Sequence, residues 1–164
     1  MNANDLVLEV ARKHCAPEWE CLSELRCGTG YGDLAEQRLD AWAIRLWEKS
    51  GIKNLIRAFE VKVTKQDFLT ETRNPDKRWL AKALSHEFYF VAPQGVIDKK
   101  LLAPDDGLME WNSKELRVVK CATTRAIMPP RWNFVASVIR SLRGGADRDM
   151  SPSKQWEREK GGRE

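Results

Sequence analysis

The sequence predicts an α/β fold in which a central mixed β-sheet is flanked by α-helices. The expected elements follow the order helix, strands, helix, strands, helix, which suits a sheet covered by helices. The chain has 164 residues, enough for one domain with a substantial core. Hydrophobic residues make up 42% and charged residues 32%, a balance that is typical of globular proteins and argues against disorder.

The first expected element is a helix over residues 5–14. Leu6 and Val10 lie four residues apart, on one face of such a helix, and Asp5 suits its start. Residues 18–27 alternate between apolar and polar side chains, which indicates a strand. The GTGYG run that follows contains three glycines and is expected to form a loop.

Two further strands are expected before the middle of the chain. Residues 38–47 are strand-like and rich in apolar groups, and residues 54–64 show the clearest strand pattern in the sequence. Ser50 and Gly51, which lie between them, are typical turn residues. This short connection is consistent with an antiparallel hairpin.

The rest of the chain continues the alternation of helices and strands. Residues 65–86 look helical, with a break near Asn74-Pro75. The apolar run EFYFVA over residues 87–92 is typical of a strand that is buried on both faces. Two short strands and an amphipathic helix are then expected over residues 107–111, 115–121 and 132–143.

The chain is expected to form one domain over residues 1–145, followed by a flexible polar tail over residues 146–164. The tail is rich in charged residues and poor in aliphatic ones. No stretch approaches the roughly 18 apolar residues of a membrane span, and the first residues lack the features of a signal peptide. We therefore expect a cytoplasmic protein without a membrane partner.

The four cysteines are expected to be free or buried thiols. They lie at positions 15, 21, 27 and 121, and none belongs to the CxxC pairs that are typical of zinc sites. A disulfide framework is not expected in a protein without a secretory signal.

The first candidate for chemistry is the pair Glu60 and Lys62. Side chains two residues apart on a strand point to the same face, about 6.5 Å from one another along the chain. Phe59, Val61 and Val63 would then point to the other face and pack into the core. An acid and a base on one face of an apolar strand need partners to offset their desolvation.

Asp40 is the expected partner of this pair. In an antiparallel hairpin centred near Ser50, Asp40 lies opposite Glu60, and opposed residues have Cβ atoms about 5 Å apart on one face. Two carboxylates at that separation repel one another, and a divalent cation would relieve the repulsion. Lys62 would then stabilise charge on a phosphoryl group or orient a water molecule. The other interpretation is a solvated polar edge without catalytic function.

The segments that carry Asp40, Glu60 and Lys62 resemble the PD-(D/E)XK nuclease superfamily. In that pattern an acid on one strand precedes a (D/E)-x-K motif on the next, as in RLDAWAI and AFEVKV here. The chain is most similar to the MmcB-type DNA-repair group and its phage relatives. The similarity extends over about residues 38–111, through RLDAWAI, FEVKVTKQDFLTE, KRW, HEFYFVAPQGVI and DDGLMEW.

The resemblance implies a restriction-endonuclease-like fold and a nuclease that hydrolyses DNA. It implies that Asp40 and Glu60 bind Mg²⁺, with Mn²⁺ as a substitute, and that Lys62 is catalytic. It further implies a role in DNA repair, recombination or phage DNA processing, and a homodimer is a common arrangement for such nucleases. Leu39 stands where the motif name has proline.

Three other acids are candidates for a supporting role. Some members of the superfamily add an acid from the first helix or first strand, and Glu9 and Glu24 match those places loosely. Asp67 follows the strand of Lys62, where it suits a helix start as well as a site role.

A run of basic residues follows the expected site. Such side chains would hold a nucleic-acid backbone, although a solvated helix face explains the same pattern equally well. The formal net charge of +4 agrees with an anionic partner without identifying one. The candidates for DNA contact are Lys65, Arg73, Lys77, Arg78 and Lys82.

Two other functions are consistent with the same residues. One is a nucleic-acid-binding module that does not cleave, and the other is a protein-interaction adaptor on the same fold. Binding of DNA without a metal requirement would favour the first, and no salt-sensitive DNA binding would favour the second.

Overall fold

The computed structural model describes residues 2–29, 37–47, 53–73 and 78–144. The expected polar tail, the turn at Ser50-Gly51, the break at Asn74-Pro75 and most of the GTGYG run lie outside these residues.

The centre of the protein is a mixed sheet of six strands in the order β1-β2-β3-β4-β5-β6. The first three strands are antiparallel to one another, β3, β4 and β5 are parallel, and β6 returns antiparallel to β5. The strands are β1 (Trp19–Arg26), β2 (Arg38–Arg45), β3 (Ile56–Val61), β4 (Glu87–Pro93), β5 (Gly107–Trp111) and β6 (Leu116–Lys120).

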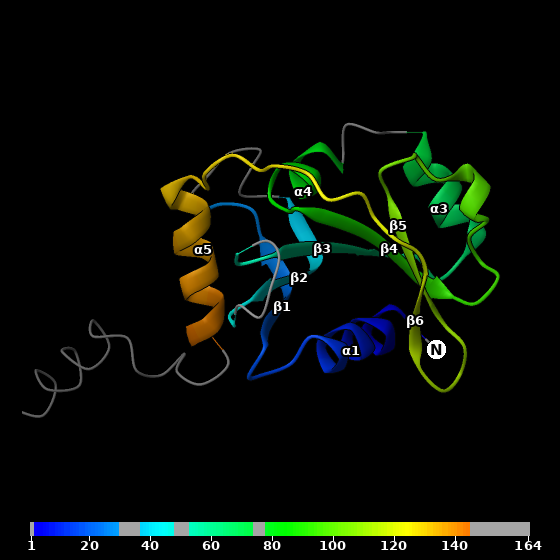
Figure 1. Ribbon diagram of the computed structural model, residues 1–164, viewed down its shortest axis with the longest axis horizontal. Coiled ribbons are helices and arrows are strands. Elements are labelled where there is room, and N and C mark those ends of the chain that lie inside the picture. Colours follow the sequence, from blue (N-terminus) through cyan, green and yellow to red (C-terminus); the bar gives the residue numbers. More distant parts are fainter. Residues whose placement is uncertain (1, 30–36, 48–52, 74–77, 145–164) are drawn as a thin grey trace, which may run out of the picture.

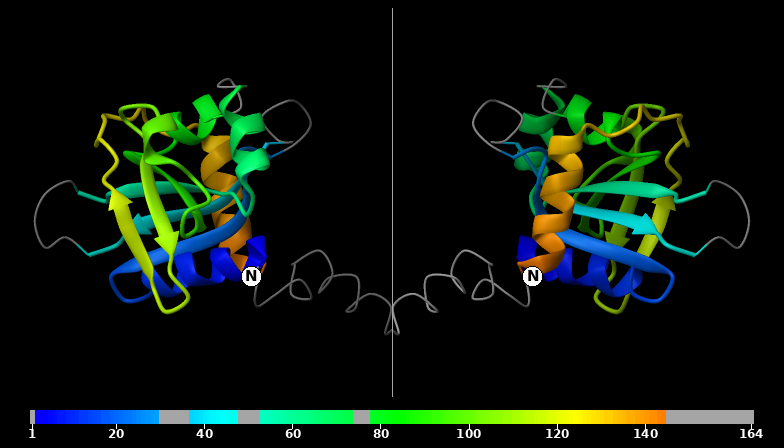
Figure 2. Two further views of the ribbon diagram at one scale, coloured as in Figure 1. Left: turned by 90° about the vertical axis from the view of Figure 1, so that its right-hand side faces the viewer. Right: turned by 90° about the vertical axis from the view of Figure 1, so that its left-hand side faces the viewer.

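Helices cover both faces of this sheet (Figure 1). Helix α1 lies against one face, whereas α3 and α4 lie on the other, and α5 stands across the strands beside β1 (Figure 2). The helices are α1 (Ala3–Lys13), α3 (Lys65–Thr72), α4 (Trp79–Ala83) and α5 (Trp132–Arg143), with a short 3₁₀ turn, η2, at Lys99–Leu101. This arrangement confirms the expected mixed sheet flanked by helices.

The core is divided by the sheet into two clusters. The cluster under α1 contains Leu6 and Val10 together with Phe59 of β3. The cluster on the opposite face contains Phe68 of α3 and Phe134 of α5, packed on Phe90 of β4. Every residue from Glu87 to Ala92 is buried, as expected for the central strand of a parallel segment.

Side-chain capping determines where helices α1 and α3 begin. Asn2, not Asp5, is the N-cap of α1; the two side chains exchange hydrogen bonds with one another's backbone N–H in a capping box. Thr64 caps α3 by accepting a hydrogen bond from the backbone of Asp67 at 3.1 Å. Both caps satisfy N–H groups that the first helical turn would leave without partners.

No helix in the described part of the chain is both long enough and apolar enough to cross a bilayer. The cysteines are free thiols, two of them exposed. Burial raises the pKa of Cys21 to about 12 and that of Cys27 to about 11, so neither thiol is poised to react.

A closed polar network lies under α1. His14 Nδ1 lies 2.9 Å from the carbonyl of Val10 and His14 Nε2 lies 3.2 Å from Arg57 Nη1. A carbonyl only accepts and a guanidinium only donates, so the imidazole is the neutral Nδ1–H tautomer. Arg57 Nε donates to Glu87 at 2.8 Å, and Thr124 donates to the same carboxylate at 2.9 Å. The buried charges of Arg57 and Glu87 thus balance one another.

This network predicts a loss of stability in acid. Burial lowers the pKa of His14 to about 4, below its unfolded value of 6.5, so the contribution to stability is present above pH 6.5 and is lost as the pH falls toward 4. Between pH 7 and 5 the free energy of unfolding should fall by about 2 kcal/mol from this group. The measurement is urea unfolding of the wild type and His14→Gln at both pH values.

His14→Gln keeps a donor and an acceptor but does not titrate. The wild type should lose about 2 kcal/mol more than the variant on acidification. The difference between the two proteins cancels contributions from other groups. Equal losses in the two proteins would contradict a neutral buried His14.

Candidate functional site

The register of β2 and β3 places Asp40 beside Glu60. Ala41 pairs with Phe59 and Trp42 with Ala58, so the next position along the ladder sets Asp40 against Glu60. The Asp40 carboxylate accepts a hydrogen bond from the backbone N–H of Val61 at 2.7 Å. This bond fixes the side chain against β3, and the two acids share the sheet face that α3, α4 and α5 cover.

Lys62 lies at the end of β3, directly beside the carboxylates. Its backbone N–H donates to the carbonyl of Val91 at 2.9 Å, which extends the pairing with β4 by one residue. Its Nζ donates to Glu60 Oε1 at 2.6 Å and lies 3.6 Å from Glu71 Oε2 of α3. The ammonium is therefore held between a carboxylate of the sheet and one of a helix.

Burial makes this group of charges unusual. The side chains of Glu60, Lys62 and Glu71 are only 21%, 13% and 11% exposed. Burial, reinforced by the negative charge of Asp40, raises the pKa of Glu60 to about 7. Burial also raises the pKa of Asp40, although its hydrogen bond from Val61 opposes the shift. Glu60 thus titrates near neutral pH, where most carboxylates are fully ionised.

The pKa of Lys62 is raised as well, but for this group a raised pKa favours the charged form. Burial alone would lower the pKa of Lys62, but the negative charge and hydrogen bond of Glu60 raise it above the ordinary value. Lys62 therefore keeps its positive charge at neutral pH. Three acids, Asp40, Glu60 and Glu71, surround this single cation, so the site is short of positive charge.

Glu24, on a third strand, is exposed and pairs with Arg38 at 3.5 Å. Ser23 pairs with Ala41 and Leu25 with Leu39, which sets Glu24 beside Asp40. The negative charge of Glu24 contributes to the raised pKa of Asp40. Glu24 has a φ of +50°, in the left-handed region that is costly for a residue with a side chain. Such strain at the edge of a charged site is a feature often found where function constrains the backbone.

The oxygen donors at this site suit a hard divalent cation. Mg²⁺ is commonly held by one or two carboxylates, with water and substrate oxygens completing the shell. Asp40 and Glu60 supply two carboxylates, and the excess negative charge around Lys62 would be relieved by a cation. No group of three or more His, Cys, Asp or Glu side chains suited to a metal is present among the described residues. A cation here would therefore depend on two carboxylates and water.

Two of the additional acids do not belong to this site. Glu9 lies on α1, which packs against the opposite face of the sheet, and it pairs with Arg12 of the same helix. The expectation for Glu9 is therefore wrong, because the sheet separates it from Asp40. Asp67 is exposed and accepts a hydrogen bond from the Thr64 hydroxyl at 2.7 Å, so its contacts are those of a helix start.

The predicted DNA-contacting residues are in different surroundings. Lys65 and Arg73 are exposed at the two ends of α3, and Lys77 lies outside the described residues.

The other two cations already contact neighbouring groups. The guanidinium of Arg78 is half-buried, with its carbon 5.4 Å from the centre of the Phe90 ring. Lys82 pairs with Asp105 at 3.2 Å and also with Asp106, so its charge is already compensated. Lys65 and Arg73 are thus the cations of this set best placed to meet a phosphate.

Glu71 is the residue that the sequence reasoning missed. It lies three residues after Phe68, which is fully buried, so both side chains face the sheet from one side of α3. Helical spacing from Phe68 was the signal that could have identified it. The aromatic run Phe88–Phe90 is buried, as expected for core residues.

Comparisons with known proteins add information on the fold. No protein-family model matches the chain, and no curated protein sequence matches it. The chain is similar to the solved structure of a protein of unknown function from Silicibacter pomeroyi, with a TM-score of 0.62 and 18% identity. The match covers 92% of this chain and 96% of that one. At this identity the similarity shows a shared α/β fold.

Proposed function

We propose that the protein is a metal-dependent nuclease that hydrolyses DNA phosphodiester bonds, with Asp40, Glu60 and Lys62 at its active centre. The observation that carries this proposal is that the largely buried side chains of Asp40 and Glu60 lie side by side on adjacent strands, with the Lys62 ammonium 2.6 Å from Glu60. An acid on one strand and E-x-K on the next is also the pattern of the PD-(D/E)XK superfamily, which the sequence resembles.

Each side chain has a role that follows from its contacts. Asp40 is oriented by the N–H of Val61, and it and Glu60 would hold Mg²⁺, or Mn²⁺ in its place. The bound cation would supply Lewis acidity and a more acidic water molecule. Lys62 is held in its charged state beside the carboxylates and would stabilise negative charge that develops on the phosphoryl oxygens.

A nucleic-acid-binding module without catalysis is the second candidate. Lys62 already neutralises Glu60 by a short ion pair, and the described residues contain no third metal ligand. These two observations are consistent with a site that does not bind a metal ion. The module would bind DNA equally well with and without Mg²⁺, whereas the nuclease would cleave it only with the metal.

The first prediction from this proposed function concerns cleavage. Labelled single-stranded, duplex, flap and junction DNAs are incubated with Mg²⁺ or Mn²⁺ and the wild type, Asp40→Asn, Glu60→Ala or Lys62→Ala. The wild type should cut at least one substrate, and each substitution should reduce the rate by about 10²-fold or more, because each removes a charge needed in the transition state.

Glu9→Gln and Lys99→Ala serve as matched controls for this assay. Glu9 lies on the opposite face of the sheet, and Lys99 lies exposed in η2. Both controls should cut as fast as the wild type. Cleavage that survives in Glu60→Ala and Lys62→Ala would contradict the proposed centre, and an inert wild type that binds DNA would favour the binding module.

The second prediction concerns the pH dependence of metal binding. A proton and a cation compete for Glu60, whose pKa is about 7, so the apparent Mn²⁺ affinity should fall about tenfold from pH 8 to pH 6. Titration calorimetry at the two pH values measures this change. Glu60→Gln should bind Mn²⁺ weakly and with little pH dependence. Equal wild-type affinity at both pH values would place the cation elsewhere.

The third prediction concerns Glu71 as a positioning residue. Its negative charge helps to raise the pKa of both Glu60 and Lys62. Glu71→Gln should therefore move the acidic limb of the pH–rate profile to lower pH and slow cleavage several-fold, less than Lys62→Ala does. Thr70→Ala, a change at an exposed position of the same helix, is the control. An unshifted pH profile in Glu71→Gln would show that Glu71 only supports the packing of α3.

A further inference from the structure

The last part of the described chain, residues 116–144, has a charge distribution unlike that of the rest. Residues 116–144 contain six Arg or Lys residues and no Asp or Glu, although the whole chain has a net charge of only +4. The rest of the molecule is therefore net negative. This segment comprises β6, the connection over residues 121–131 and helix α5.

Three of the six cations are engaged by neighbouring groups. Lys120 donates to backbone carbonyls, including that of Ala103 at 2.8 Å. Arg125 lies 3.4 Å from Asp105, and Arg117 pairs with Glu115. The other three, Arg131, Arg140 and Arg143, are exposed, and none forms an ion pair with a described residue. These three arginines have their charge available to a partner.

Exposed apolar side chains lie among these arginines. Trp132 is 85% exposed and Met128 is 78% exposed, the two highest values among the large hydrophobic residues described. Trp132 begins α5 directly after Arg131. A free indole beside a free guanidinium offers a stacking surface and a positive charge at the same place.

This surface lies on the same side of the sheet as the carboxylates. Phe134 of α5 packs edge-on against Trp42 of β2, with ring centres 5.7 Å apart. Trp42 is two residues from Asp40, so both side chains point from β2 toward the face that α5 covers. Ser137 further anchors α5 by donating to the carbonyl of Arg26 at 2.7 Å. A chain bound along α5 would therefore lie on the face that contains the proposed active centre.

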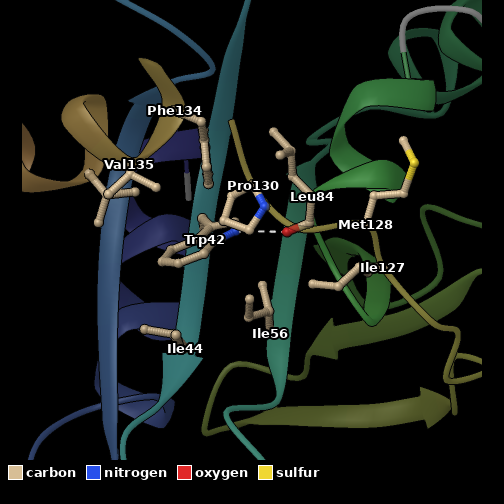
Figure 3. Close-up of a pocket in the computed structure, with 10 residues that line it drawn as sticks. Trp42, Ile44, Ile56, Leu84, Ile127, Met128, Pro130, Phe134 and Val135 are labelled. Atoms are coloured by element: carbon tan, nitrogen blue, oxygen red, sulfur yellow. Dashed lines mark hydrogen bonds between the residues drawn. The ribbon is translucent and has the colours of Figure 1, made fainter. Parts of the chain in front are cut away.

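The cavity beneath α5 is not suited to bind a nucleobase through hydrogen bonds. It has a volume of about 190 Å³ and is lined by apolar side chains, among them Ile44, Ile56 and Val135 (Figure 3). The indole N–H of Trp42 already donates to the carbonyl of Leu84 at 3.1 Å. A base inserted there would lose the hydrogen bonds of its edges. A nucleic acid that contacts α5 would therefore lie on its outer surface and not in this cavity.

We propose that Arg131, Trp132, Arg140 and Arg143 form a binding surface for single-stranded DNA. The arginines contact phosphates, and Trp132 stacks on a base without reading sequence, which is how single strands are bound by many proteins. A duplex keeps its bases stacked inside and offers no ring face to Trp132. This inference rests on the proposed function and specifies its substrate as DNA with a single-stranded segment.

The test measures binding without catalysis. Fluorescence anisotropy follows a labelled oligodeoxythymidylate, and a duplex of equal length, titrated with the full-length protein in EDTA over a range of salt concentrations. The variants are Trp132→Ala and the triple change Arg131→Ala, Arg140→Ala and Arg143→Ala. The controls are Trp47→Ala, an exposed tryptophan two residues after β2, and Arg12→Ala on α1.

The wild type should bind the single strand at least tenfold more tightly than the duplex. Trp132→Ala should weaken single-strand binding at least fivefold. The triple variant should reduce the slope of log affinity against log salt by about 2, because each phosphate contact contributes about 0.7. The controls should bind like the wild type.

Two results would overturn the inference. One is binding that Trp132→Ala and the triple variant leave unchanged. The other is a protein that binds no DNA and self-associates through α5, seen as a dimer that Trp132→Ala converts to a monomer. Binding is measured in EDTA and cleavage is measured separately with Mg²⁺ or Mn²⁺, so the two proposals can fail independently. Binding in EDTA without cleavage in the presence of metal would contradict the nuclease and support the binding surface. Cleavage in the presence of metal without this binding would support the nuclease and contradict the binding surface.

Discussion

The antiparallel register of β2 and β3 is the constraint on which the candidate site depends. Because side chains alternate along a strand, a slip of one residue would turn Asp40 to the face of α1 while Glu60 stayed on the other. The buried pairs Ala41–Phe59 and Trp42–Ala58 hold the register, since each has small and large side chains that face one another. The hydrogen bond from Val61 N–H to Asp40 adds a polar contact that exists only in this register.

Buried charges are balanced on one face of β3 and unbalanced on the other. On the α1 face, Arg57 is matched by Glu87 and completed by a neutral His14, so the network is closed and its charge is balanced. On the other face, Lys62 is surrounded by more carboxylate charge than it can neutralise, and the pKa of Glu60 rises to about 7. Unbalanced charge in a half-buried site destabilises the fold and is expected where a ligand or cation supplies the missing charge.

Much of this arrangement follows from local patterns in the sequence. Alternating apolar residues around Glu60 and the short connection after β2 are sufficient to predict the hairpin, and the hairpin predicts that Asp40 and Glu60 lie side by side.

The residues that join the site from other elements could not be predicted in this way. Glu71 reaches Lys62 because Phe68 packs on Phe90 and orients α3, which is a tertiary contact. Glu9 fits the sequence pattern of a supporting acid, but α1 crosses beneath the sheet instead of above it. In the sequence Lys82 has no evident partner, but in the structure it pairs with Asp105 and Asp106, which lie more than twenty residues later in the chain.

The central claim is that Asp40 and Glu60 form one electrostatically coupled pair, and a ¹³C NMR titration of the Glu60 side-chain carboxyl tests it most directly. In metal-free protein the account predicts a midpoint near pH 7, because burial and the charge of Asp40 both disfavour ionisation. In Asp40→Asn, which keeps an acceptor for Val61 N–H but carries no charge, the midpoint should fall. A wild-type midpoint at the ordinary glutamate value, or one that Asp40→Asn leaves unchanged, would contradict the coupled pair.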